Sequence, residues 1–303
     1  MSIDRISRRG LFALVSTAAP ALWVARRGMA QQQGGIEVTP LTDRLSLLSG
    51  AGGNIAILRG PDGILLVDTG VPQASQEIEK RARAAGVPIT VILTQYHYDH
   101  VGANDRLAKA GARIFAHENT YKRLNAEQQK AFFGGQAPPA GAAAPKTVFT
   151  DAGSLTIAGE TVLYKHMPPA HTDGDVVVLF ESANVYHTGD LLFNGMYPYI
   201  DYAAGGSIEG MAADAERMYQ DVDSRTKIIP GHGPIASRED LRTYKAMLEG
   251  VNERISKLVR EGRTLEETKA AGPTKEFDEK WGRGFFEPKQ FVELIYKGKT
   301  GGA

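Results

Sequence analysis

Residues 94–100 read Thr94-Gln95-Tyr96-His97-Tyr98-Asp99-His100, and they contain two of the seven histidines in the chain. Directly before them, Ile89–Leu93 is an apolar run interrupted only by Thr90, which is the pattern of a buried strand. A buried strand that ends in imidazole, amide and carboxylate side chains carries them to the edge of a sheet. The segment therefore predicts a polar site at the end of a strand.

The side chains of this segment are expected to converge. In an extended chain alternate residues point the same way, so Gln95, His97 and Asp99 should face one cavity. His100 follows where the chain turns toward a helix, which lets its ring reach the same cavity. Because imidazole and carboxylate groups suit zinc, the segment predicts a metal site.

Three later segments place similar side chains beside turn residues: Ala170-His171-Thr172, Thr188-Gly189-Asp190 and Pro230-Gly231-His232-Gly233. Turn residues of this kind hold a polar side chain at the rim of a sheet. We therefore expect the histidines and the aspartate of these segments to join the site. Taken alone, the aspartate also fits a turn or a helix cap.

Apolar runs and turn signals alternate along the chain. Strands and helices that recur in two successive halves predict an α/β fold in which helices cover sheets within one domain. The expected strands are 45–48, 54–58, 64–67, 89–93, 114–116, 154–157, 161–166, 176–180, 184–187 and 227–229, and the expected helices are 74–85, 104–110, 208–220 and 238–261. The Gly- and Pro-rich residues 127–145 predict a flexible insertion.

The first thirty residues show the three parts of an export signal. These parts are a basic start, an apolar run and a small-residue cleavage site: Arg5, Arg8 and Arg9, then Leu11 to Val24, then Gly28-Met29-Ala30. The apolar run is shorter than the ~20 residues that a bilayer span needs, so no stable membrane anchor is expected.

The arginine pair at the start of this signal resembles the twin-arginine type. Residues 1–30 are then a signal peptide, and residues 31–303 form a periplasmic or secreted domain. The twin-arginine export machinery becomes a partner of the precursor. The alternative is an ordinary secretion signal in which two arginines occur by chance.

Composition limits the classes of partner and chemistry. The formal net charge of the 303 residues is zero, so no general attraction to nucleic acid is expected, and the expected partner is a small-molecule substrate. The chain has no cysteine, which excludes disulfides, thiolate metal ligands and a cysteine nucleophile.

Together the four segments resemble the metallo-β-lactamase superfamily, whose signature is His-x-His-x-Asp-His followed by distant His, Asp and His. The resemblance runs from about Leu41 to His232. It implies an αββα sandwich of two mixed β-sheets flanked by helices, with a C-terminal helical extension in the same domain.

The resemblance also implies two metal positions, with zinc expected and iron or manganese as alternatives. The first position would take Gln95, His97 and His171, and the second would take Asp99, His100 and His232. Asp190 would bridge the two positions. Asp68, at the end of its own strand, would support the ligands from behind.

Gln95 departs from the signature, which has histidine at this place. An amide oxygen is a neutral and weaker donor than an imidazole, although it can still coordinate through its carbonyl. We therefore expect the first metal position to bind its ion more weakly than the second.

The implied activity is hydrolysis by a metal-bound hydroxide that attacks an ester, thioester, lactone or lactam carbonyl. Asp99 or Asp190 would act catalytically by orienting the water and accepting its proton. Two alternatives stay open: an exported β-lactamase proper, and a non-catalytic metal-binding accessory protein. A redox di-iron protein is disfavoured because no flavin or iron–sulfur module accompanies the site.

Several other side chains have two interpretations. His117, His166 and His187 lie outside the motif and are expected to be hydrogen-bonded core residues. Tyr96 and Tyr98 are expected to pack around the site. The residues Tyr197, Tyr199, Asp201 and Tyr202 could form a substrate wall or a surface loop, and the loops 127–145 and 196–207 would shape the pocket.

Overall fold

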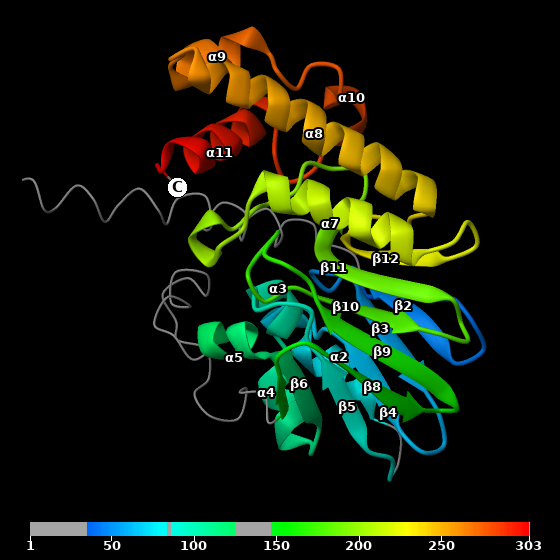
Figure 1. Ribbon diagram of the computed structural model, residues 1–303. Helices are drawn as coiled ribbons and strands as arrows, with labels where there is room; N and C mark the ends of the chain where they lie inside the picture. Colours follow the sequence, from blue (N-terminus) through cyan, green and yellow to red (C-terminus); the bar gives the residue numbers. More distant parts are fainter. Residues whose placement is uncertain (1–34, 84–85, 125–146, 303) are drawn as a thin grey trace, which may run out of the picture.

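The computed structural model describes residues 35–83, 86–124 and 147–302. In this part of the chain two sheets pack face to face, and helices cover the outer face of each (Figure 1). The expected αββα sandwich is confirmed. The expected signal peptide and the expected insertion 127–145 lie outside the described residues.

The first sheet is mixed, with the strand order β1-β2-β3-β4-β5-β6-β7. Strands β1 to β4 form an antiparallel meander, and β4 to β7 are parallel to one another. The bounds are β1 Glu37–Pro40, β2 Leu45–Ser49, β3 Ile55–Arg59, β4 Ile64–Val67, β5 Ile89–Ile92, β6 Arg113–His117 and β7 Thr147–Phe149. Short β1 and β7, at the two edges, were not expected from the sequence.

The parallel strands are joined by helices on the outer face of this sheet, as crossover connections require. The 3-10 turn η1 Pro72–Ala74 and helix α2 Ser75–Ala82 join β4 to β5. Helices α3 Tyr98–Val101 and α4 Asn104–Lys109 join β5 to β6, and α5 Glu118–Leu124 follows β6. Buried residues of α2 and α4 pack with those of β3, β4 and β5 in one apolar cluster.

The second sheet has the order β12-β11-β10-β9-β8. Its strands are β8 Ala152–Ile157, β9 Glu160–His166, β10 Val176–Phe180, β11 Val185–Phe193 and β12 Lys227–His232. Strands β11 and β12 are parallel, and the 3-10 turn η2 Tyr202–Ala204 and helix α7 Ile208–Asp221 connect them. Strand β11 is buried along its whole length, and it runs past the expected end at residue 187.

One apolar core lies between the sheets. Residues of both sheets share one apolar cluster, with Leu47, Leu58 and Val67 from the first and Val178 and Phe180 from the second. Strand β4 is buried at every position, which explains its uninterrupted apolar sequence. This packing fixes the ends of the strands of the two sheets relative to each other.

Four helices follow β12 and cover the second sheet with α7 (Figure 1). They are α8 Arg238–Arg260, α9 Leu265–Ala271, α10 Asp278–Trp281 and α11 Pro288–Thr300. Ser237 and Thr264 begin α8 and α9 with capping boxes, which satisfy free N–H groups at the helix start. Trp281, Phe285 and Phe291 are buried against the domain. In residues 35–83, 86–124 and 147–302 no helix is long and apolar enough to cross a membrane.

Candidate metal centre

The candidate ligands lie where strands end or loops begin on one edge of the sandwich. Asp68 follows β4, residues 94–100 follow β5, His171 lies between β9 and β10, Asp190 lies in β11, and His232 ends β12. The sheet packing therefore brings together residues that are far apart in the sequence.

A first cluster consists of His97, His171 and Asp190, and one ligand atom of each lies within 4.8 Å of the others. The Nδ1 atom of His97 is 3.0 Å from Nε2 of His171. The same Nε2 atom is 3.3 Å from Oδ2 of Asp190. All three residues are buried.

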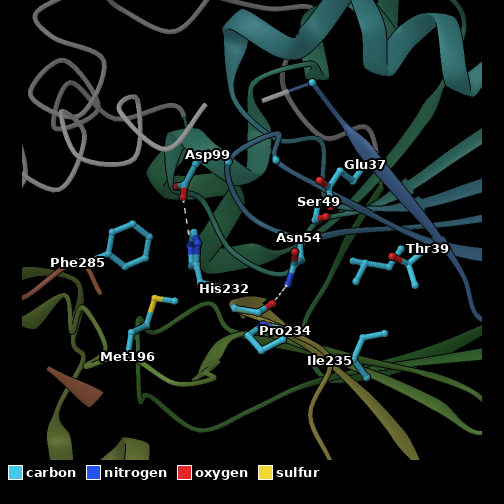
Figure 2. Close-up of a pocket in the computed structure, with 15 residues that line it drawn as sticks. Glu37, Thr39, Ser49, Asn54, Asp99, Met196, His232, Pro234, Ile235 and Phe285 are labelled. Atoms are coloured by element: carbon cyan, nitrogen blue, oxygen red, sulfur yellow. Dashed lines mark hydrogen bonds and ion pairs between the residues drawn. The ribbon is translucent and has the colours of Figure 1, made fainter. Parts of the chain in front are cut away.

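A second cluster consists of Asp99, His100 and His232, again within 4.8 Å of one another. The Nε2 atom of His232 is 3.2 Å from Oδ2 of Asp99 (Figure 2). The Nε2 atom of His100 is 3.9 Å from the same oxygen. Asp99 is the most exposed of the three, with 17% of its side chain accessible.

Asp190 lies between the clusters. Its Oδ2 atom faces His171, whereas its Oδ1 atom is 3.2 Å from Nε2 of His100 and 3.4 Å from Nε2 of His232. Each oxygen thus faces a different group of imidazoles, which is the arrangement of a bridging carboxylate.

The donor set fits divalent cations. The Nε2 atom of His100 and Oδ1 of Asp190 are buried, and within the described residues neither atom makes a hydrogen bond. Leaving a buried polar atom unpaired costs roughly 1–3 kcal/mol. A cation that binds to both atoms would remove this cost. Imidazole nitrogens and carboxylate oxygens converging on one point would give that cation four-coordinate nitrogen and oxygen ligation, as in zinc sites.

Gln95 takes a different position from the other candidates. Its Oε1 atom accepts a hydrogen bond from the backbone N–H of His97 at 2.5 Å, and its Nε2 donates to Oδ2 of Asp190 at 3.2 Å. Turning the amide over would place two donors against each other at His97, so the backbone selects this orientation. The carbonyl expected to coordinate is therefore already engaged by the backbone of His97.

Gln95, His97 and Asp99 lie around one site that shares Asp190, as expected, but strict alternation of side chains does not extend to Asp99. Helix α3 begins at Tyr98, so the chain is no longer extended when it reaches Asp99. A helix turns about 100° per residue, and this rotation directs Asp99 and His97 to different clusters.

Three of the four imidazoles of the site are held by a further polar partner. Nδ1 of His100 is 2.8 Å from Oδ2 of Asp68, which also accepts a hydrogen bond from the hydroxyl of Thr94 at 2.6 Å. Nδ1 of His171 is 2.9 Å from the backbone oxygen of Tyr199. Such outer partners fix the ring and the tautomer of a metal-binding histidine. The expected supporting place of Asp68 behind the site agrees with this geometry.

His97 is held by a carboxylate that the sequence did not single out as a support. Its Nε2 atom is 3.0 Å from Oδ2 of Asp201, and the hydroxyl of Tyr96 donates a short hydrogen bond to the same oxygen. Asp201 and Tyr199 are buried beside the ligands, so residues 199–201 are not a surface loop. The spacing of residues in the sequence does not predict this pairing, because it joins residues on separate elements.

Two glycines allow the backbone to approach the ligands closely. A Cβ atom on Gly231 would lie 2.0 Å from Oδ1 of Asp190, and one on Gly53 would lie 2.5 Å from the ring of His100. Both contacts are impossible for any larger residue without displacing a ligand.

The charges of the site keep its carboxylates ionised. Burial opposes this, yet the imidazoles of His100, His232 and His171 lower the pKa of Asp190. Burial lowers the pKa of His171 to about 4 despite the charge of Asp190, so this ring is neutral near pH 7. Anionic carboxylates and a neutral imidazole are the states in which these groups bind cations.

The three remaining histidines lie outside both clusters. The rings of His117 and His166 stack, with centroids 3.6 Å apart. His187 is buried, and its Nε2 atom is 3.2 Å from the backbone oxygen of Asn54. His117 and His187 agree with the expectation of hydrogen-bonded buried residues, whereas His166 is only half-buried.

A groove of about 660 Å³ opens beside the second cluster, and Asp99 and His232 line it (Figure 2). Its other walls come from the β1–β2 hairpin, from residues after β11 and β12, and from the segment between α10 and α11. The C-terminal helices thus contribute directly to the surroundings of the site. The ring of Phe285 lies perpendicular to the ring of His232, and the two ring centroids are 4.8 Å apart.

Comparison with known proteins agrees with a site of this family. The family model described as "Metallo-beta-lactamase superfamily" matches residues 48–232. The human acyl-coenzyme A thioesterase MBLAC2 is 24% identical over 211 residues, which cover 61% of this chain and 74% of that protein.

Solved structures share the fold. A metallo-beta-lactamase from Pontibacter korlensis has a TM-score of 0.59 and 18% identity over 71% of this chain and 99% of that one. The sec-alkylsulfatase Pisa1 from Pseudomonas sp. has a TM-score of 0.64 and 19% identity over 91% of this chain and 51% of that one. A match over 91% of this chain must include residues that follow His232, so the sulfatase also has helices in this region.

Proposed function

Because this chain belongs to the metallo-beta-lactamase superfamily, we propose that it hydrolyses an ester, thioester, lactone or lactam at a centre of two divalent cations. The observation that carries the proposal is the place of Asp190, whose two oxygens face separate clusters of imidazoles.

The ligands that we propose are divided unequally. His97, His171 and Asp190 would hold the first cation, with Gln95 as a weak further donor only if its amide leaves His97. Asp99, His100, His232 and Asp190 would hold the second. Zinc suits these nitrogen and oxygen donors, and iron or manganese suits them as well. Bound there, two divalent cations lower the pKa of water toward neutrality and polarise a carbonyl oxygen.

The protein side chains have their own tasks in this proposal. Asp99 is the partly accessible carboxylate beside the groove, so it is placed to orient an entering water and to accept its proton. Asp190 is 4% exposed, and its two oxygens would link the two groups of ligands. Asp68 and Asp201 keep the rings of His100 and His97 from rotating.

The similar proteins support hydrolysis as the type of reaction, but they do not identify the substrate. A thioesterase stands among the proteins similar in sequence, and a β-lactamase and an alkylsulfatase stand among those similar in fold. A non-catalytic metal-binding role would need no groove at the second cluster, whereas this structure has one. We also propose that residues 1–30 direct export by the twin-arginine route to the periplasm or beyond.

The test combines metal analysis with a small hydrolysis panel. The protein without residues 1–30 is loaded with zinc, dialysed mildly and assayed with an aryl ester, a lactone, a thioester and a chromogenic β-lactam. We expect turnover of at least one of them that is lost with chelator and restored with metal. The variant His166→Ala, outside both clusters, should keep that turnover. Equal activity in metal-free and metal-loaded protein would refute the proposal.

A further inference from the structure

The groove beside the second cluster has two chemically different sides. In the view of Figure 2, Phe285 and Met196 lie on one side of the pair formed by Asp99 and His232. On the other side lie the polar side chains of Glu37, Ser49 and Thr39, which come from the β1–β2 hairpin, together with the apolar Ile235. A molecule that reaches the candidate catalytic Asp99 must therefore extend one part toward an apolar surface and another toward a polar one.

The apolar side is rigid because the C-terminal helices hold it. Gly284 lets its segment pack directly on Met196, since a Cβ atom there would lie 2.2 Å from Cβ of Met196. The backbone N–H of Tyr197 donates to the oxygen of Trp281 at 2.9 Å, which ties this segment to the loop after β11. An apolar substituent of the substrate would be stabilised here because it removes this apolar surface from water.

The polar side carries negative charge and no compensating positive charge. Among the described residues that line the groove, Glu37 is the acidic side chain outside the proposed ligand set, and none is lysine or arginine. Glu37 is exposed at the start of β1 and makes no ion pair with a described residue. Sites that recognise carboxylates, sulfates or phosphates use arginine or lysine, and this groove offers neither.

From these observations we infer that the substrate has one apolar part and a second part that is uncharged or cationic, and that the groove discriminates against an anionic group on this second part. This inference rests on the proposed function, because it concerns the selectivity of the same centre. It separates the open substrate classes by charge: neutral esters and lactones fit the groove, whereas compounds that carry a free carboxylate or phosphate there do not.

The experiment uses three matched 4-nitrophenyl esters with five-carbon acyl chains. The chains end in a methyl group, a carboxylate or a trimethylammonium group, and the aryl leaving group is the apolar part in each. We expect kcat/KM of the zinc-loaded protein to fall in the order cationic, neutral, anionic. Each step should be about two- to fivefold at low salt, the size of an exposed charge pair, and should shrink at high salt.

Glu37 tests the origin of this order. Glu37→Gln should bring the three kcat/KM values together, and Glu37→Lys should favour the anionic ester over the cationic one. Glu266→Lys is the matched control, because it makes the same charge change at a side chain on α9 that is 82% exposed and does not line the groove. It should preserve the original order.

The outcomes separate the two proposals. Hydrolysis of the esters without a preference by charge, or with a preference that neither Glu37 variant alters, overturns the selectivity and leaves the hydrolase intact. Failure of the zinc-loaded protein to cleave any ester, lactone, thioester or lactam overturns the hydrolase, and the selectivity falls with it.

Discussion

The two metal clusters share Asp190 but differ in how completely the chain builds them. The second cluster has an aspartate and two histidines of its own, and it faces the groove. The first has two histidines, and an amide that hydrogen-bonds to protein stands where a further imidazole is expected. This difference indicates that two metal positions that share a carboxylate need not have the same affinity for a cation. The remaining donors decide how tightly each holds its ion.

Removal of a ligand should separate the clusters most clearly. We expect His100→Ala to abolish turnover and the tighter metal together, with a loss well beyond the ~10–100-fold that an outer partner costs. His97→Ala should remove the weaker metal and leave about one per chain. Metal analysis and kcat/KM with the best ester of the panel measure both effects. Loss of the tighter metal in His97→Ala, with retention in His100→Ala, would reverse the assignment.

Substitution of the outer carboxylates should act on one cluster each. Asp68→Asn should weaken the second position, and Asp201→Asn the first, each by roughly 10–100-fold in metal affinity. The reason is that each carboxylate fixes one ligand ring, that of His100 or His97. Competition with a chromogenic chelator gives the two affinities. Identical changes at both positions in either variant would show that the two clusters are coupled and have no separate supports.

A third change should make the clusters more alike. Gln95→His supplies an imidazole in place of the engaged amide, and we expect the first position to bind zinc about tenfold or more tightly, since imidazole is a regular zinc ligand. Mild dialysis should then leave two metals per chain where the unaltered protein keeps about one. Gln95→Glu, a ligand of similar length, serves as the control for charge. Two equally tight metals in the unaltered protein would end the idea of a weak first position.

Much of this arrangement could be predicted from the sequence because it is local or repeated in a family signature. The apolar residues of β4, β5 and β10, in which Thr90 is the one polar side chain, identified buried strands, and turn residues beside His171 and His232 marked a loop and a strand end. The alternation proposed for residues 95–99 ends at Tyr98, because the chain enters a four-residue helix, Tyr98–Val101, that is too short to leave a periodic pattern.

What could not be predicted depends on contacts between distant elements. The carboxylate of Asp201 meets Tyr96 across 105 positions of sequence, and nothing near Asp201 indicates this partner. The placement of Phe285 beside His232 likewise follows from how the C-terminal helices dock on the second sheet. Local patterns specify which side chains can bind metal, whereas tertiary packing specifies which side chains hold them in place.

The smallest expected effect concerns histidines that belong to neither cluster. Burial and the neighbouring ring of His166 lower the pKa of His117, so the folded protein binds this proton less readily than the unfolded chain, where histidine titrates near 6.5. As the pH falls through that value and below it, the unfolded state takes up the extra proton and stability decreases. His117→Gln should therefore reduce the loss of stability between pH 7 and pH 5, measured by urea unfolding in the presence of chelator. Metal content and turnover should not change, which would confine metal binding to the two clusters. A variant whose metal content falls would instead connect the stacked pair to the centre.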